Sequence, residues 1–374
     1  MQSLHFNRGR ISLRDKILSL DIKLILLILL LGIISFFAMY STERGNLQYY
    51  TQSHIYRFCI FFSLFILLSF VQIKHWLKIS YIFYFIILVL LFGVDTFGVT
   101  ASGSKRWISL MVFNLQPSEL MKVALIMFLA RYYNKIPTRD VNHIKTMIVP
   151  TFALFIPVAL ITTQPDLGTA ALVAIGGLAV IWLAGFRVKY FLYGSILLIC
   201  LAPVMIAFLK SYQKARILTF LNPERDPLGA GYQIIQSKIA IGSGGLFGKG
   251  YLQGSQSYLD YLPEKHTDFI FTLFSEEFGF VGSIGILLIY ALIIQRIVVI
   301  GYQTRNNFAK LYCFGFAAAF FTYVTVNMSM VLGLLPIVGA PLPILSYGGS
   351  SMLSMMVGLA IVMSCKIYYQ DTND

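Results

Sequence analysis

The chain has 374 residues, of which 57% are hydrophobic and only 12% are charged, and its formal net charge is +13. A soluble globular protein carries about 25% charged residues, so this composition excludes an ordinary soluble fold. A surplus of Lys and Arg is typical of membrane proteins, where it fixes the topology and meets anionic headgroups. No basic, aromatic-interleaved soluble module is present that would bind nucleic acid.

Ten apolar runs follow one another along the chain. They cover residues 24–40, 55–72, 79–94, 118–133, 147–163, 168–185, 190–209, 269–294, 311–335 and 347–367. A bilayer core about 30 Å thick needs roughly 17–25 apolar residues per helix, and backbone hydrogen bonding in lipid leaves only helices or a closed barrel. Because the runs do not alternate as barrel strands do, they predict an all-α polytopic protein with ten transmembrane helices in one domain, residues 1–374.

Basic residues mark one side of the membrane. They gather before the first run and in alternate connections between later runs, whereas the short intervening connections hold few. The positive-inside rule therefore predicts that the N-terminus is cytoplasmic. An even number of helices returns the C-terminus to the same side, and the long polar connection 210–268 then lies on the outer face.

The connection 210–268 ends at Asp268, directly before an apolar run. Loops on a rigid scaffold often carry function, and residues 232–241 have the periodicity of a short helix on the membrane surface. With His266 beside it, the Asp268 carboxylate is a candidate general base. Asp is equally typical of a helix N-cap, and from the residues alone both interpretations stay open.

Glu119 and Lys122 stand three residues apart, just inside the fourth apolar run. This spacing places both side chains on one helix face, where they can pair. Ionisable groups inside a membrane are costly and usually face a cavity. A purely structural ion pair fits the same pattern.

Two short outer connections carry further polar candidates. Gln164 and Asp166 form a tight turn in which Asp166 is also a natural N-cap for the next helix. Arg106 lies next to Lys105 and Trp107, a group that can hold a phosphate or simply anchor the chain at the interface.

Residues 243–250, SGGLFGKG, form a Gly-rich turn that contains Lys249. The turn departs from the P-loop pattern, since Ser stands where the first Gly belongs and Gly where Ser or Thr should follow the Lys. This departure excludes nucleotide hydrolysis, but a backbone that approaches a sugar or phosphate remains compatible with the sequence.

Several motifs together resemble one family. They are NPERDPLGAGYQ, IAIGSGGLFGKGYLQGSQS, LPEKHTDFIFTLFSEEFGFVG, QPDLGTA, KRWI, QPSELMK and GAPLPILSYGGSS. In this order they resemble the SEDS family (shape, elongation, division and sporulation) of cell-wall polymerases, and most closely its elongation branch. The resemblance runs from about residue 106 to residue 351.

The resemblance implies a fold, an activity and a location. Ten transmembrane helices with a large extracytoplasmic loop between helices 7 and 8 are expected in a bacterial inner membrane. The expected activity is that of an inverting peptidoglycan glycosyltransferase, which polymerises lipid II into a lipid-linked glycan for cell elongation. The expected partners are a class B penicillin-binding protein that crosslinks the strands, the elongation machinery and membrane lipids.

The resemblance also implies roles for individual residues. Asp268 matches the essential loop aspartate of the family, and is expected to deprotonate the acceptor hydroxyl or to position a divalent cation, Mg²⁺ or Mn²⁺. Arg106 and Lys122, with Lys249, are expected to stabilise the leaving pyrophosphate, and Glu119 to orient Lys122. His266, Gln164 and Asp166 are expected to support these groups.

Two other functions compete with the enzyme. A lipid II flippase would use the buried Glu119 and Lys122 equally well, but it would not need a long outer loop that ends in Asp268. A scaffold for the transpeptidase would tolerate the loss of Asp268 and Lys122.

Overall fold

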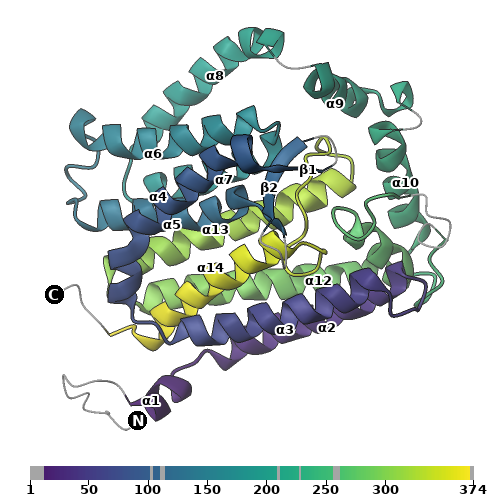
Figure 1. Cartoon of the computed structure of the whole chain (residues 1–374), viewed down its shortest axis with the longest axis horizontal. Coiled ribbons are helices and arrows are strands. Elements are labelled where there is room, and N and C mark those ends of the chain that lie inside the picture. Colours follow the sequence, from purple (N-terminus) through teal and green to yellow (C-terminus); the bar gives the residue numbers. More distant parts are fainter. Residues whose placement is uncertain are drawn as a thin grey trace.

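The protein is a bundle of helices, seen in a computed structural model that describes residues 12–101, 104–109, 114–208, 211–226, 229–255 and 262–370 (Figure 1). The helices are α1 (Leu13–Leu18), α2 (Ile22–Thr42), α3 (Tyr49–Ser69), α4 (Ile73–Phe97), α5 (Pro117–Asn134), α6 (Ile144–Thr163), α7 (Leu167–Leu183), α8 (Val188–Phe208), α9 (Ser211–Leu221), α10 (Ala230–Ser243), α12 (Ile270–Gln303), α13 (Asn307–Val331) and α14 (Gly349–Ile367). The all-α prediction is confirmed.

Each of the ten predicted apolar runs overlaps one helix over most of its length. Within the described residues, seven helices are long and apolar enough to cross a membrane, namely α2, α3, α4, α6, α12, α13 and α14. The apolar stretches of α7 and α8 are shorter, and α5 carries Glu119, Lys122 and Arg131 among its residues. The chain is therefore a multi-pass membrane protein, whereas the count of ten crossings stays a prediction.

The centre of the bundle is α5. Every residue of this helix from Pro117 to Ala130 is buried, because α4, α7, α13 and α14 all pack around it. The outer helices instead expose large apolar side chains, as α8 does at Leu192, Leu197 and Ile199. A polytopic membrane protein presents such side chains to lipid.

A small antiparallel sheet lies in the connection between α4 and α5. Its strands are β1 (Val99–Ala101), β2 (Ser104–Ser109) and β3 (Asn114–Leu115), in the order β1-β2-β3. With three and two residues, β1 and β3 are too short for the alternating pattern that reveals a strand in a sequence. Strand β2 contains Arg106, which belongs to the candidate site described below.

The long connection between α8 and α12 contains ordered helices. Figure 1 shows α8 along the upper edge, followed by α9 and then α10, which runs down one side of the bundle. A 3-10 helix, η1 (Pro223–Arg225), joins α9 to α10. The short helix expected at 232–241 is confirmed as part of α10, which ends at Ser243 where the Gly-rich turn begins.

Candidate active site

Four helices begin close to one another. Their first residues are Pro117 of α5, Leu167 of α7, Ile270 of α12 and Gly349 of α14. The Gln116 N–H donates to Ser350 Oγ at 2.8 Å, Gln116 Nε2 donates to Asp166 Oδ2 at 3.0 Å, and the Tyr347 N–H donates to the His266 carbonyl at 2.8 Å. The N-terminal end of a helix carries partial positive charge and binds anions. The convergence of four such ends therefore favours an anionic ligand.

A buried ion pair lies one turn inside α5. Lys122 Nζ donates to Glu119 Oε2 at 2.7 Å, and both side chains are almost wholly inaccessible to solvent. Tyr323 of α13 covers the pair, with its hydroxyl 3.3 Å from both Glu119 oxygens and its ring centroid 3.8 Å from Lys122 Nζ. Ser354 of α14 donates to the Glu119 carbonyl at 2.7 Å. The pair is thus fixed from three helices.

Asp166 joins α7 to the sheet. Its Oδ1 accepts the N–H of Thr169 at 3.1 Å, so Asp166 is the N-cap that its sequence position predicts. Its Oδ2 lies 3.8 Å from the Arg106 guanidinium. Arg106 also donates to the carbonyls of Gln164, at 3.2 Å, and Pro165, and Gln164 Nε2 donates to the Leu91 carbonyl at 2.7 Å. These bonds hold Arg106 beside the starts of α5 and α7.

Asp268 lies in the turn before α12 and is not the N-cap of that helix, which is Phe269. Asn327 of α13 donates through Nδ2 to the Asp268 carbonyl at 3.0 Å and to the Ala340 carbonyl at 2.6 Å. The pKa of Asp268 is raised to about 7, chiefly by burial and next by the nearby Glu264 carboxylate, while Arg216 opposes the rise. A carboxyl group with this pKa exchanges protons at neutral pH, as a general base requires.

Electrostatic coupling links the separate groups. Asp166 interacts with Lys122 and also with Asp268, and the Tyr323 hydroxyl interacts with Asp268 as well. The Oδ1 atom of Asn327 is buried and accepts no hydrogen bond from the part of the chain that the structure describes. The region therefore offers a proton acceptor, two cations and an unused hydrogen-bond acceptor.

His266 packs on the other side of the Asp268 turn. Its Nδ1 is hydrogen-bonded to Thr42 Oγ1 at 2.8 Å, and its ring stacks on Tyr50 with centroids 4.1 Å apart. Tyr50 in turn meets Tyr347 edge to face at 5.1 Å. These contacts connect α2, α3 and the turn before α14 to the turn that carries Asp268.

Lys249 has other partners. Its Nζ donates to Glu276 Oε1 at 2.6 Å and to Ser255 Oγ at 2.9 Å, and the same Glu276 oxygen accepts the Ser255 N–H at 3.0 Å. The Glu276 side chain is completely buried. The contacts of Lys249 thus fasten the Gly-rich turn to α12.

Comparison with known proteins places this geometry in a family. A sequence model of the cell cycle proteins FtsW, RodA and SpoVE matches residues 18–371. The chain belongs to this family. The peptidoglycan glycosyltransferase MrdB of Escherichia coli K12 is 45% identical over 284 residues, which cover 75% of this chain and 76% of MrdB. Stage V sporulation protein E of Bacillus subtilis strain 168 is 36% identical over 305 residues, or 79% and 80% of the two chains.

Solved structures of family members have the same fold. A chain from a peptidoglycan synthase complex, whose structure describes the coordination of polymerization and crosslinking, matches with a TM-score of 0.82 and 29% identity, over 94% of this chain and 99% of that one. RodA of Thermus thermophilus matches with a TM-score of 0.69 and 26% identity, over 94% and 98%. The resemblance found in the motifs is therefore confirmed.

Three further residues of this FtsW/RodA/SpoVE member belong to the site. Tyr323 is 204 residues from Glu119 in sequence and lies within an apolar run, so no local pattern indicates its role. Arg216 lies on α9, a helix that the sequence of the polar connection does not predict. Gln116 is different, because it stands in the QPSELMK motif just before a helix start and is detectable there.

Proposed function

We propose that the protein is a peptidoglycan glycosyltransferase that polymerises lipid II into glycan strands. The observation that carries the proposal is the 45% identity to a protein named peptidoglycan glycosyltransferase, over three quarters of both chains. The site adds physical support. It combines a carboxyl group whose pKa is about 7 with two cations, Lys122 and Arg106, that are fixed by hydrogen bonds to their own neighbours.

In this proposal Asp268 accepts the proton of the acceptor sugar's hydroxyl. The oxygen then attacks the anomeric carbon of the donor, and the bond to the lipid pyrophosphate breaks with inversion. Negative charge develops on the departing pyrophosphate, and preorganised cations lower the barrier most when they meet charge as it forms. Lys122 and Arg106 supply those cations, and the four helix N-termini add to the positive potential.

Supporting residues keep these groups in place. Glu119 and Tyr323 orient Lys122, and Asp166 with the Gln164 carbonyl orients Arg106. His266 steadies the turn of Asp268 through its contacts with Thr42 and Tyr50. Lys249 is the third cation expected at the pyrophosphate, and like Lys122 it is paired with a carboxylate, in its case that of Glu276.

A divalent cation is the alternative partner of Asp268. Within the described residues, no group of three His, Cys, Asp or Glu side chains could hold a metal ion. A Mg²⁺ or Mn²⁺ ion at Asp268 would therefore take its other ligands from water and from the substrate's phosphates, which is how Mg²⁺ usually binds. It would supply positive charge to the leaving group.

The cellular setting is part of the same proposal. We infer that the protein lies in the bacterial inner membrane with both termini in the cytoplasm and the site on the outer face. We also infer that it acts with a class B penicillin-binding protein during elongation. Similarity to a chain from a complex that coordinates polymerization and crosslinking supports such a partner.

The decisive experiment is polymerisation of labelled lipid II by the purified protein with its transpeptidase, comparing the wild type with Asp268→Ala. Glycan ladders from the wild type alone are expected. Equal product from both proteins would keep the enzyme but remove Asp268 from its centre. No product from either, while the partner crosslinks preformed glycan and both proteins remain folded, would redirect attention to flippase activity, measured as movement of labelled lipid II across vesicles.

A further inference from the structure

The helix α12 is broken at Gly279. The φ of Gly279 is 65° and its ψ is −160°, a conformation that is essentially restricted to glycine. In an uninterrupted helix the N–H groups of residues 280 and 281 would donate to the carbonyls of residues 276 and 277. The break separates these partners and leaves two donors and two acceptors to be satisfied elsewhere.

The Gly-rich turn after α10 satisfies all four groups. The N–H of Phe280 donates to the Gly245 carbonyl at 2.9 Å, and the N–H of Val281 donates to the Leu246 carbonyl at 3.1 Å. In return, the Glu276 and Glu277 carbonyls accept the N–H groups of the turn residues 249, at 3.0 Å, and 250, at 3.1 Å. The turn therefore replaces a piece of the helix, and the break is a fixed feature of the fold.

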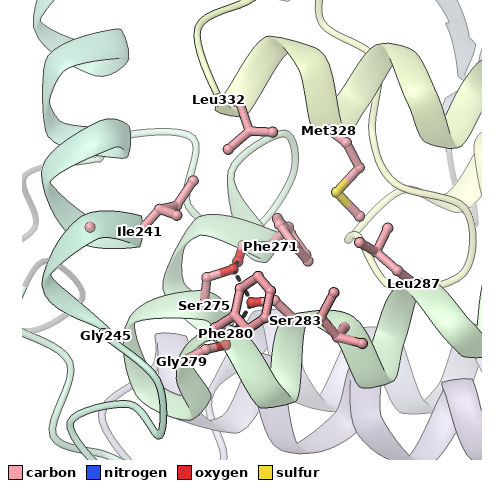
Figure 2. Close-up of a pocket in the computed structure, with 12 residues that line it drawn as sticks. Ile241, Gly245, Phe271, Ser275, Gly279, Phe280, Ser283, Leu287, Met328 and Leu332 are labelled. Atoms are coloured by element: carbon pink, nitrogen blue, oxygen red, sulfur yellow. Dashed lines mark hydrogen bonds between the residues drawn. The ribbon is translucent and has the colours of Figure 1, made fainter.

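An apolar pocket lies at this break, between α10, α12 and α13. It has a volume of about 260 Å³. Figure 2 shows Ile241 of α10, Met328 of α13 and Leu332 at the end of α13 facing Phe271 and Leu287 of α12 across a common space. The exposed fractions of Leu332 (43%) and Leu287 (38%) show that the pocket opens on the surface. In a membrane protein such an apolar opening faces lipid.

The polar side chains of the pocket are already satisfied from within. Ser283 Oγ donates to the Gly279 carbonyl at 2.7 Å and lies 2.9 Å from Ser275 Oγ, and Ser275 Oγ donates to the Phe271 carbonyl at 2.8 Å (Figure 2). These hydroxyl groups bond to their own helix. A sugar would need polar partners, whereas a hydrocarbon chain needs only the apolar walls.

Two residues that line the pocket are neighbours of the Asp268 turn in the chain. Phe271 follows Asp268 by three residues. Met328 follows Asn327, whose Nδ2 atom donates to the Asp268 carbonyl at 3.0 Å. A hydrocarbon chain attached to a pyrophosphate near Asp268 would thus meet this pocket within its first units.

We propose that the pocket binds the polyprenyl chain of the lipid-linked substrate. The inference rests on the proposed function, since it takes the substrate's pyrophosphate to lie near Asp268. In this inference the break in α12 has a function beyond packing. It opens a lateral passage through which the polyprenyl chain leaves the active site toward the lipid. A bulk phospholipid chain is the competing occupant.

Gly242 and Gly285 provide a matched pair of substitutions. A Cβ atom added at either glycine would meet no atom within 4 Å, and both glycines lie in helices. Only Gly242 lines the pocket. Gly242→Leu therefore fills the pocket and Gly285→Leu does not, and in both a better helix former replaces glycine.

The test measures KM for lipid II analogues that carry one to eleven isoprene units. In the wild type and Gly285→Leu, we expect KM to fall as the chain lengthens. In Gly242→Leu, KM for the analogue with the longest chain should rise about tenfold. This is the loss of affinity expected when roughly two methylene groups can no longer be buried in an apolar site. KM for the one-unit analogue should stay unchanged. Identical chain-length dependence in the three proteins would overturn the inference while leaving the enzyme intact.

A binding experiment separates this inference from the proposed function. The same proteins in vesicles are irradiated with a diazirine-labelled polyprenyl phosphate or a diazirine-labelled phosphatidylglycerol. Labelling of the Met328 peptide by the polyprenyl probe, lost in Gly242→Leu alone, would support the pocket even if no glycan forms. Equal labelling by both probes would show a general lipid slot and overturn the assignment, and so would no labelling by the polyprenyl probe.

Discussion

At the scale of single residues, the protonation of Asp268 sets the expected pH dependence. Its pKa is about 7, raised chiefly by burial, and only the deprotonated carboxylate accepts a proton. The polymerisation rate should therefore rise with pH through about 7. Glu264→Gln removes a negative neighbour and should move the profile to lower pH, whereas Arg216→Gln removes a positive one and should move it to higher pH. Profiles of the three proteins that superimpose would contradict the role of Asp268 as the titrating base.

The same pKa has a consequence for stability. The folded-state pKa of Asp268 lies above its usual value of 3.8, so the folded protein favours the protonated carboxyl group. This contribution to stability is complete below pH 3.8 and is lost as pH rises through about 7. Asp268→Asn should thus remove activity while making the protein no less stable above pH 7, which excludes unfolding as the reason for inactivity.

The ion pair of Glu119 and Lys122 carries the third residue-scale prediction. Lys122→Met leaves a buried carboxylate without its partner and should destabilise the fold by about 3–5 kcal/mol. The double variant Glu119→Gln with Lys122→Met removes both charges and should recover most of the melting temperature. If Lys122 acts on the pyrophosphate, the double variant stays inactive. Recovery of activity together with stability would make the pair purely structural.

These residues also show which contacts of single side chains can be predicted from the sequence. Spacing alone predicted the pairing of Glu119 with Lys122, and the structure confirms it. The contact of Tyr323 with this pair depends on how α13 packs against α5, and no local pattern encodes packing between distant segments.

At the scale of elements, the break in α12 supports the fourth prediction. A side chain at Gly279 would collide with the Gly248 backbone, and its left-handed conformation costs a residue with a Cβ about 1–3 kcal/mol. Gly279→Ala should lower the melting temperature and the polymerisation rate together. Gly285→Ala, in open space on the same helix, should instead stabilise by up to about 1 kcal/mol. Equal effects of both substitutions would mean that the break is not needed.

The break illustrates why elements are harder to predict than apolar runs. The run 269–294 predicted a helix there, and α12 confirms it. Its interruption depends on hydrogen bonds from a turn some thirty residues earlier, which meets α12 only after folding. The Gly-rich composition of 243–250 is compatible with a backbone that approaches a sugar or phosphate; in the structure this backbone forms hydrogen bonds with α12.

At the scale of the whole molecule, the number of helices that cross the membrane stays a prediction. Charge bias predicts the side of each connection, but α5, α7 and α8 do not meet the length and apolarity of the seven clear candidates. Positive charge alone cannot decide whether these three helices cross, because a short helix packed inside a bundle needs less apolar surface than one surrounded by lipid.

Three exposed arginines make this prediction testable. Arg139 lies between α5 and α6, Arg187 between α7 and α8, and Arg225 between α9 and α10. In a cysteine-free protein, Cys at 139 and 187 should react with an impermeant maleimide only after the inner membrane is permeabilised, whereas Cys at 225 should react in intact spheroplasts. Labelling of 187 without permeabilisation would mean that α7 does not cross after α6. Protection of 225 would place the long connection, and with it Asp268, on the cytoplasmic side, where an outer-face polymerase could not use it.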